Sequence, residues 1–173
     1  MEHAWNVILV VELQDVVKNM KNSIKKSLNN MGFSLPKSIK VAGSYVPFLK
    51  ENKFLFISGQ LPIKNNKVLF LGKINEKNKN YGYKAAQLCA LNILGLINIA
   101  IKGNFSEIIR CVRINGFVNC EKSFFEHPFV INGASDLIKK ILKKKGLHTR
   151  TAIGVSSLPF NASVEVDAIF LTK

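Results

Sequence analysis

Arginine and acidic residues are scarce in this chain of 173 residues. It has 25 Lys and Arg residues against 11 Asp and Glu, but the arginines are only Arg110, Arg113 and Arg150. A net charge of +14 is typical of proteins that bind nucleic acid, yet phosphate forks and direct base readout favour arginine over lysine. The excess of Lys and Asn indicates the codon drift of an AT-rich genome. We therefore interpret most of the charge as solvated surface; nucleic acid is disfavoured as a partner but stays open.

Cysteine is also rare. Cys89, Cys111 and Cys120 are an odd number and have no spacing typical of a metal site, which argues against a disulfide framework or a zinc site and favours a reducing, cytoplasmic setting. The longest uninterrupted apolar run, Val7–Val11, is far short of the roughly 20 residues that span a bilayer, so we expect no membrane partner. The Ser-His-Asp order of a hydrolase triad and a phosphate-binding glycine loop are both absent.

The length and the 47% hydrophobic content predict one folded domain. Residues 1–19 are interpreted as an extension outside the core, and 20–173 as the domain. An amphipathic helix is expected over Asn22–Met31, and Gly32 is a natural end for it.

The remaining pattern predicts an α+β fold in which a mixed sheet packs on two helices. One layer of helices leaves the second sheet face uncovered, and oligomerisation is the simplest way to cover it. One helix is interrupted by Asn132–Gly133, which breaks its pattern. The expected elements are a hairpin of Val41–Phe48 and Lys53–Ser58, a strand Val68–Leu71 after a turn at Asn65–Asn66, a helix Tyr81–Lys102, a strand Ile108–Val118, the interrupted helix Phe124–Lys145, and strands Thr151–Ser156 and Ser163–Leu171.

Two residues are candidates for chemistry. Arg150 begins a strand, where a guanidinium can hold a carboxylate with two parallel hydrogen bonds, although an ordinary surface arginine fits equally well. Glu165 lies among apolar strand neighbours, where a carboxylate is either paired in a salt bridge or poised for proton transfer.

Other polar residues carry weaker signals. Tyr45 and Ser58 are expected on the two hairpin strands, and Gly59 allows close approach of a ligand to the backbone. Asn132 precedes a glycine. Each of these polar residues is more often a turn or capping residue than a ligand contact. His127 and His148 are interpreted as structural or solvent-facing.

The order of several motifs resembles that of the YjgF/Rid (reactive intermediate deaminase) family. The resemblance covers residues from about 20 to 173 and is similar to the longer branch that is often labelled endoribonuclease L-PSP. The matching segments are Gly43–Phe48 (GSYVPF), Phe56–Pro62 (FISGQLP), Ala85–Leu94 (AAQLCALNIL), Asn132–Leu137 (NGASDL), His148–Val155 (HTRTAIGV), Leu158–Pro159 and Val164–Ala168 (VEVDA).

The resemblance implies a chorismate-mutase-like α+β fold and a homotrimer, in which three sheets form a central barrel and the active sites lie in clefts between subunits. It also implies hydrolysis of reactive enamines and imines, such as 2-aminoacrylate, to 2-keto acids and ammonia, with no metal or organic cofactor. The expected partner is thus a small imino or keto acid.

By the same resemblance, Arg150 binds the substrate carboxylate and Glu165 positions or activates water. Tyr45, Ser58 and Asn132 line the pocket. Backbone amides near Gly59 or Ala152 complete it. Many family members have a cysteine where this chain has Ala152, which excludes a thiol switch there.

Two other functions remain open at this point. One is an endoribonuclease or translation inhibitor, suggested by the basic charge and the family label, although no paired histidines for phosphodiester cleavage are visible. The other is a non-catalytic protein that binds 2-keto acids in the same cleft.

Overall fold

A computed structural model describes residues 24–36 and 44–173, so the predicted extension over residues 1–19 lies outside the described residues. Residues 24–29 are helical, as predicted, and their apolar side chains Ile24 and Leu28 join the hydrophobic core. Gly32 has φ +74°, and its amide donates to the carbonyl of Asn29, which ends this helix.

The main sheet has five strands in the order β1-β2-β7-β5-β6. The first four are antiparallel to their neighbours, whereas β5 and β6 are parallel and are joined by a helical crossover. A small hairpin of β3 (Ile63–Lys64) and β4 (Lys67–Val68) stands apart. The strands of the main sheet are β1 (Phe48–Glu51), β2 (Phe54–Gln60), β5 (Ile108–Asn119), β6 (Thr149–Val155) and β7 (Val164–Thr172).

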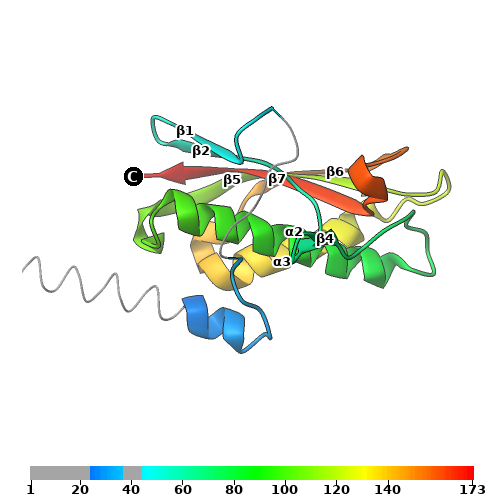
Figure 1. Cartoon of the computed structure of the whole chain (residues 1–173), viewed down its shortest axis with the longest axis horizontal. Coiled ribbons are helices and arrows are strands. Elements are labelled where there is room, and N and C mark those ends of the chain that lie inside the picture. Colours follow the sequence, from blue (N-terminus) through cyan, green and yellow to red (C-terminus); the bar gives the residue numbers. More distant parts are fainter. Residues whose placement is uncertain (1–23, 37–43) are drawn as a thin grey trace, which may run out of the picture.

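Two long helices, α2 (Lys79–Ala100) and α3 (His127–Leu142), lie side by side on one face of this sheet (Figure 1). This arrangement confirms the predicted α+β fold. Short 3-10 turns flank the strands at Phe105–Glu107, Lys143–Gly146 and Pro159–Asn161. By length and composition α2 could cross a membrane, but 67% of its most apolar window is buried inside the protein, as is usual for a core helix.

The two faces of the sheet differ in exposure. Along β7, even-numbered residues such as Val166 and Phe170 are buried under the helices, while odd-numbered residues such as Glu165 point to the other face. No described helix covers that outer face (Figure 1). Hydrophobic side chains on it are exposed, among them Phe54, Phe56 and Ile153.

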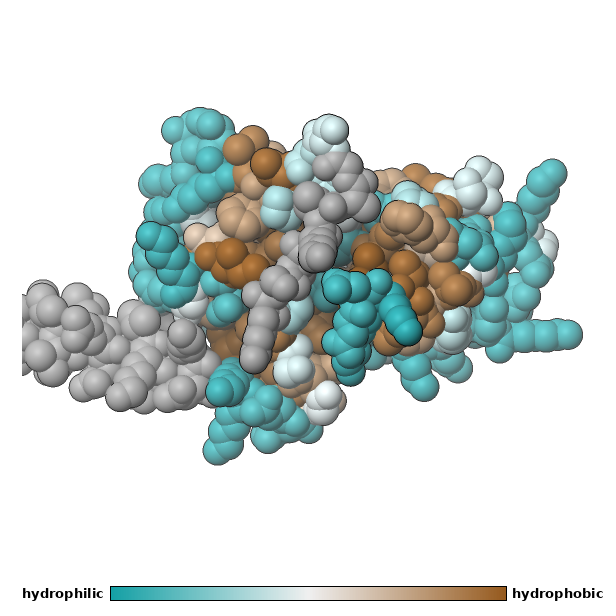
Figure 2. Space-filling view, viewed as in Figure 1, coloured by the Kyte–Doolittle hydropathy of each residue, from teal (hydrophilic) through white to brown (hydrophobic). Residues whose placement is uncertain are grey.

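Hydrophilic residues do not cover the whole of the visible surface (Figure 2). On the face shown in Figure 2, hydrophilic residues gather mainly at the two ends of the molecule, and hydrophobic residues reach the surface between them.

The predicted strand over Val41–Phe48 is wrong. Residues 41–43 lie outside the described part, and the chain from 44 to 47 is not a strand. Pro47 has no amide hydrogen for the ladder, although its carbonyl accepts from the Ser58 amide, so the strand begins after it. The turn between β1 and β2 contains Asn52, which adopts φ +54°.

The predicted interruption of the second helix at Asn132–Gly133 is also wrong, because α3 runs through both residues without a break. Gly133 is there because the helices approach closely: a Cβ atom at this position would lie 2.0 Å from the carbonyl oxygen of Tyr83 in α2. The glycine that suggests a break is a packing residue.

Candidate functional site

Arg150 lies on the helix side of the sheet and is held by α3. Its Nη1 donates to Asn132 Oδ1 at 2.7 Å and to Ser135 Oγ at 3.1 Å. His148, two residues earlier in the chain, brings its Nε2 to 3.0 Å from Ser135 Oγ. We call these four residues the Arg150 cluster. Among the described strands β6 pairs only with β5, so the cluster lies at the edge of the sheet.

A second group, the Glu165 group, consists of Glu165, Ser58 and Gly59 on the outer face. The Glu165 carboxylate lies directly over Gly59, where a Cβ atom would come within 2.0 Å of its Oε1. The register of β2 against β7 shifts between Ile57 and Gln60, and Gln60 Nε2 fixes this bulge by donating to the carbonyls of Ser58 and Gly59. Any larger residue at position 59 would require the carboxylate to leave this position.

The electrostatics of the Glu165 group suit proton transfer. Burial, and secondarily the negative charge of Asp167, raise the pKa of Glu165 above its ordinary value. Among residues 24–36 and 44–173, the Glu165 carboxylate has no hydrogen-bond partner, whereas Asp167 accepts from Asn115 Nδ2 at 2.8 Å. A carboxyl with a raised pKa and free lone pairs can order a water molecule or exchange a proton.

Within one chain, Arg150 and Glu165 are not brought together. Arg150 is in register with the buried Ile114, on the face that the helices cover. Glu165 is in register with Phe117 and points to the opposite face. A pocket that uses both residues must therefore take them from different copies of the chain.

The remaining predicted residues divide between these faces. Asn132 belongs to the Arg150 cluster, and Ala152 lies on the same face and packs against the core. Ser58 donates its hydroxyl to the Val46 carbonyl at 2.7 Å. Tyr45 lies in a bend before β1 and not on a strand; it is 49% exposed, and its hydroxyl has no hydrogen bond within the described residues.

Ser135 and His148 are functional candidates that the sequence interpretation missed or set aside. Two spacings could have indicated them. Ser135 follows Asn132 by three positions on α3, so these two residues share a face of the helix. His148 lies directly before β6, two positions ahead of Arg150. His148 was expected to be structural or solvent-facing. It is half-buried and contacts the group that holds Arg150.

The three cysteines are free and buried, in agreement with the expectation of no disulfide framework. Burial raises the pKa of each thiol, to about 12 for Cys111, which makes them poor nucleophiles. His127 Nε2 lies 3.4 Å from Cys120 Sγ, and burial lowers the pKa of this histidine, so the pair is neutral. The described residues contain no group of three or more His, Cys, Asp or Glu that could hold a metal ion.

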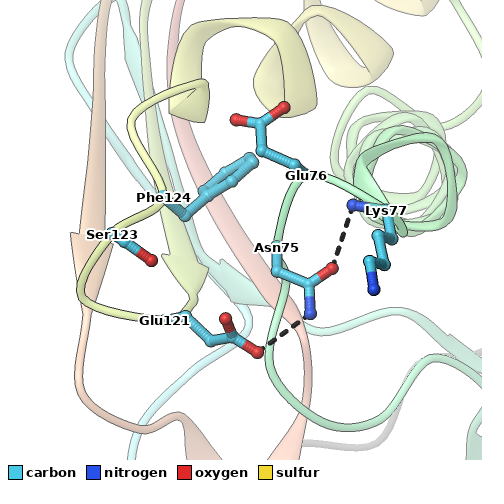
Figure 3. Close-up of a pocket in the computed structure, with 6 residues that line it drawn as sticks. All are labelled: Asn75, Glu76, Lys77, Glu121, Ser123 and Phe124. Carbon is cyan, nitrogen blue, oxygen red and sulfur yellow. Dashed lines mark hydrogen bonds between the residues drawn. The ribbon is translucent and has the colours of Figure 1, made fainter.

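A cavity of about 330 Å³ lies elsewhere, between the loops that precede α2 and α3 (Figure 3). Asn75 bridges the two loops by donating to Glu121 Oε1 at 2.9 Å. Within its own loop, Asn75 accepts from the Lys77 amide at 3.1 Å. None of the predicted site residues lines it. Its carboxylates Glu76 and Glu121 make it a poor site for an organic acid.

The fold is of the α+β class, with a mixed sheet and two helices on one face. A fixed arginine lies at the edge of this sheet, and a carboxyl lies on its open face. The chain belongs to the family described as "YjgF/chorismate mutase-like, putative endoribonuclease", whose sequence model matches residues 25–171. The resemblance seen in the sequence is thereby confirmed.

Similar proteins agree with this assignment. Protein TCP17 of Trypanosoma cruzi is 36% identical over 148 residues, which cover 84% of this chain and 92% of that protein. The crystal structure of Atu1372, a protein of unknown function from Agrobacterium tumefaciens, has a TM-score of 0.86 at 40% identity and covers 92% of this chain and 99% of its own. A structure from Shewanella oneidensis that carries an endoribonuclease label has a TM-score of 0.81 at 30% identity, covering 86% and 98%.

Proposed function

We propose that this protein hydrolyses reactive enamines and imines of small 2-amino acids to 2-keto acids and ammonia, in a cleft between subunits. The observation that carries the proposal is the division of two complementary groups between the faces of the sheet. One face holds a fixed guanidinium, Arg150, and the other holds a carboxyl of raised pKa, Glu165.

The two groups divide the chemistry between them. Arg150 binds the substrate carboxylate by a charge-assisted fork. Glu165 orders a water molecule, which adds to the imine carbon while a proton passes to the nitrogen; collapse of the carbinolamine then releases ammonia and leaves the keto acid. Holding both reactants in one geometry lowers the barrier by proximity. Residues Gly59 and Ser58 shape the wall beside Glu165.

A homotrimer is part of the same proposal. The outer face exposes Phe54, Phe56 and Ile153, and a homotrimer with sheets facing inward would cover them. In such an assembly the Arg150 edge of one copy meets the outer face of the next. This arrangement would bring Arg150 of one copy to Glu165 of another.

One protein with the same fold was solved with a small ligand, which supports the proposal. The structure of Escherichia coli TdcF, which shares the fold at a TM-score of 0.53 and 19% identity, was solved with bound serine. That ligand is a small amino acid and belongs to TdcF alone.

An endoribonuclease function is supported by the basic net charge of +14 and by the label of the family and of its Shewanella oneidensis member. Cleavage of RNA by acid-base chemistry needs groups that change protonation near neutral pH. Burial lowers the pKa of both His127 and His148, and each ring already contacts a neighbouring side chain. We therefore rank this function second.

The test is a coupled assay in which a pyridoxal-phosphate-dependent dehydratase generates 2-aminoacrylate from serine, and pyruvate release is followed. We expect acceleration by the wild-type protein and a loss of about 100-fold in Arg150→Ala, because a charge-assisted fork is removed. Arg150→Lys keeps the charge without the fork and should fall between. Lys140→Ala, which removes an exposed positive charge from α3, is the control.

Three outcomes would contradict the proposal or redirect it. Equal activity of wild type and Arg150→Ala excludes the assigned role. Binding of 2-oxobutanoate without any turnover favours a keto-acid-binding protein. Cleavage of RNA at low salt by wild type, retained in Arg150→Ala, favours the endoribonuclease.

A further inference from the structure

Only one nitrogen of the Arg150 guanidinium is engaged by the described protein. Nη1 carries two hydrogens, and these have two acceptors, Asn132 Oδ1 at 2.7 Å and Ser135 Oγ at 3.1 Å. Nε and Nη2 have no hydrogen bond within residues 24–36 and 44–173. They form the side of the guanidinium that can meet both oxygens of a carboxylate. The contacts at Nη1 therefore determine the direction in which that free side points.

The proton positions behind Ser135 follow from what each atom can do. His148 Nδ1 lies 2.7 Å from the carbonyl oxygen of Gly146, which can only accept, so Nδ1 carries a hydrogen. In a neutral ring Nε2 is then an acceptor, and at 3.0 Å it accepts the Ser135 hydroxyl hydrogen. The Ser135 oxygen is left with lone pairs for Arg150 Nη1. The hydrogen bonds therefore run from Arg150 Nη1 to Ser135, from Ser135 to His148 Nε2, and from His148 Nδ1 to the Gly146 carbonyl.

A protonated His148 would break this order. Its Nε2 would also donate, so Ser135 would receive two donors while its own hydrogen lost its acceptor. The charged groups that act on the ring are Arg150 on β6 and Lys139 on α3, and both are positive. Burial is the main cause that lowers the pKa of His148. The hydrogen bond to Gly146 raises this pKa, whereas the charges of Arg150 and Lys139 lower it; the net shift is downward, so the ring is neutral at pH 7.

We propose that His148 and Ser135 form a neutral relay that orients the Arg150 guanidinium, with its Nε and Nη2 side presented to a carboxylate ligand. His148 is thus a positioning residue that acts through Ser135. The relay rests on the proposed function for the identity of the ligand, but its hydrogen-bond order belongs to the free protein. It can be tested without any substrate.

The first measurement is the tautomer and pKa of His148 in the ligand-free protein by ¹⁵N NMR of the imidazole. We expect the neutral tautomer with hydrogen on Nδ1, and a higher His148 pKa in Arg150→Met, since a nearby positive charge is removed. A hydrogen on Nε2, or a His148 pKa that does not respond to Arg150→Met, overturns the relay whatever the activity.

The second measurement is the Kd for 2-oxobutanoate in variants that keep or remove the acceptor for Ser135. We expect Ser135→Ala and His148→Leu to weaken binding about tenfold, the effect of losing one hydrogen bond to a charged group. His148→Gln can offer an amide oxygen near the position of Nε2 and should recover much of the affinity. In turnover assays KM should change more than kcat. Thermal unfolding identifies any variant that merely fails to fold.

The two proposals fail in different ways. If wild type neither binds 2-oxobutanoate nor hydrolyses imines, yet the His148 tautomer and its response to Arg150→Met are as expected, the proposed function fails and the hydrogen-bond order stands. If wild type binds 2-oxobutanoate and Ser135→Ala binds it equally well, the relay is wrong and the proposed function stands.

Discussion

The two candidate groups on opposite faces of the sheet differ in how tightly the protein holds them. In the Arg150 cluster, Ser135 accepts from Arg150 and is itself hydrogen-bonded to His148, and this chain of hydrogen bonds ends at the Gly146 carbonyl. On the outer face, Glu165 lies over a bare backbone without a hydrogen bond inside the described residues. A group that binds an anion benefits from fixed orientation, whereas a group that exchanges protons needs free lone pairs. The contrast matches the roles proposed for them.

The largest effect should come from filling the space beside Glu165. Gly59→Ala places a methyl group where the Glu165 carboxylate lies, so one of them must move. We expect a loss of about 100-fold in kcat/KM with little change in the Kd for 2-oxobutanoate, because the Arg150 cluster is untouched. In a Glu165→Ala background the same substitution should cost nothing further. Unchanged kcat/KM in Gly59→Ala would contradict the assigned position of Glu165.

The second prediction concerns the packing of α3, the helix that holds Arg150, against α2. Gly133→Ala places a methyl group 2.0 Å from the Tyr83 carbonyl and forces α2 and α3 apart, which we expect to lower the free energy of unfolding by about 1–3 kcal/mol. Gly82→Ala is the matched control in α2, since its methyl group would meet only the side chains of Val130 and Ile74 at 3.1–3.2 Å. Urea unfolding measures both. A smaller effect at Gly133 than at Gly82 would contradict the close helix contact.

A smaller effect concerns the unpartnered carboxyl itself. Because the pKa of Glu165 is raised above 4.5 in the folded chain, the folded state binds this proton more tightly than the unfolded state does. Stability is therefore lost as pH rises from about 4.5 through the raised pKa. We expect Glu165→Gln to have a higher Tm than wild type at pH 7, and the difference to vanish as pH falls below 4.5. The exposed Glu51→Gln is the control; a lower Tm for Glu165→Gln at pH 7 would indicate a hidden partner.

Much of the fold could be predicted because its longest elements carry a clear period. The helix α2 and the strands β5 and β7 lie within a few residues of their predicted bounds. The errors concern residues that can have either of two structural roles. The pattern predicts a strand through Pro47, but this proline prevents a strand there. It also predicts a helix break at Gly133, but this glycine permits a close contact between two helices.

The site was harder to predict than the fold. The residue pattern favoured a surface role for Arg150 as much as a binding role, and the resemblance to a family was needed to choose. Asn132 and Arg150 are 18 positions apart in the sequence, and their hydrogen bond forms because α3 packs against β6. The same packing creates the contact of Ser135 with His148, which no local pattern encodes. The sequence pattern predicts which residues share a face of a helix or strand. Tertiary packing determines which of these faces contact one another.

In the proposed function, Arg150 and Glu165 act together only across a subunit boundary. Arg150→Ala and Glu165→Gln should each have about 1% of wild-type activity or less when assayed alone. After the two variants are unfolded together and refolded at equal amounts, random assembly places an intact Arg150 beside an intact Glu165 of a neighbour at about a quarter of the interfaces of a trimer. We therefore predict recovery of about a quarter of wild-type activity in the mixture. No recovery, although mixed oligomers form, would contradict a shared site.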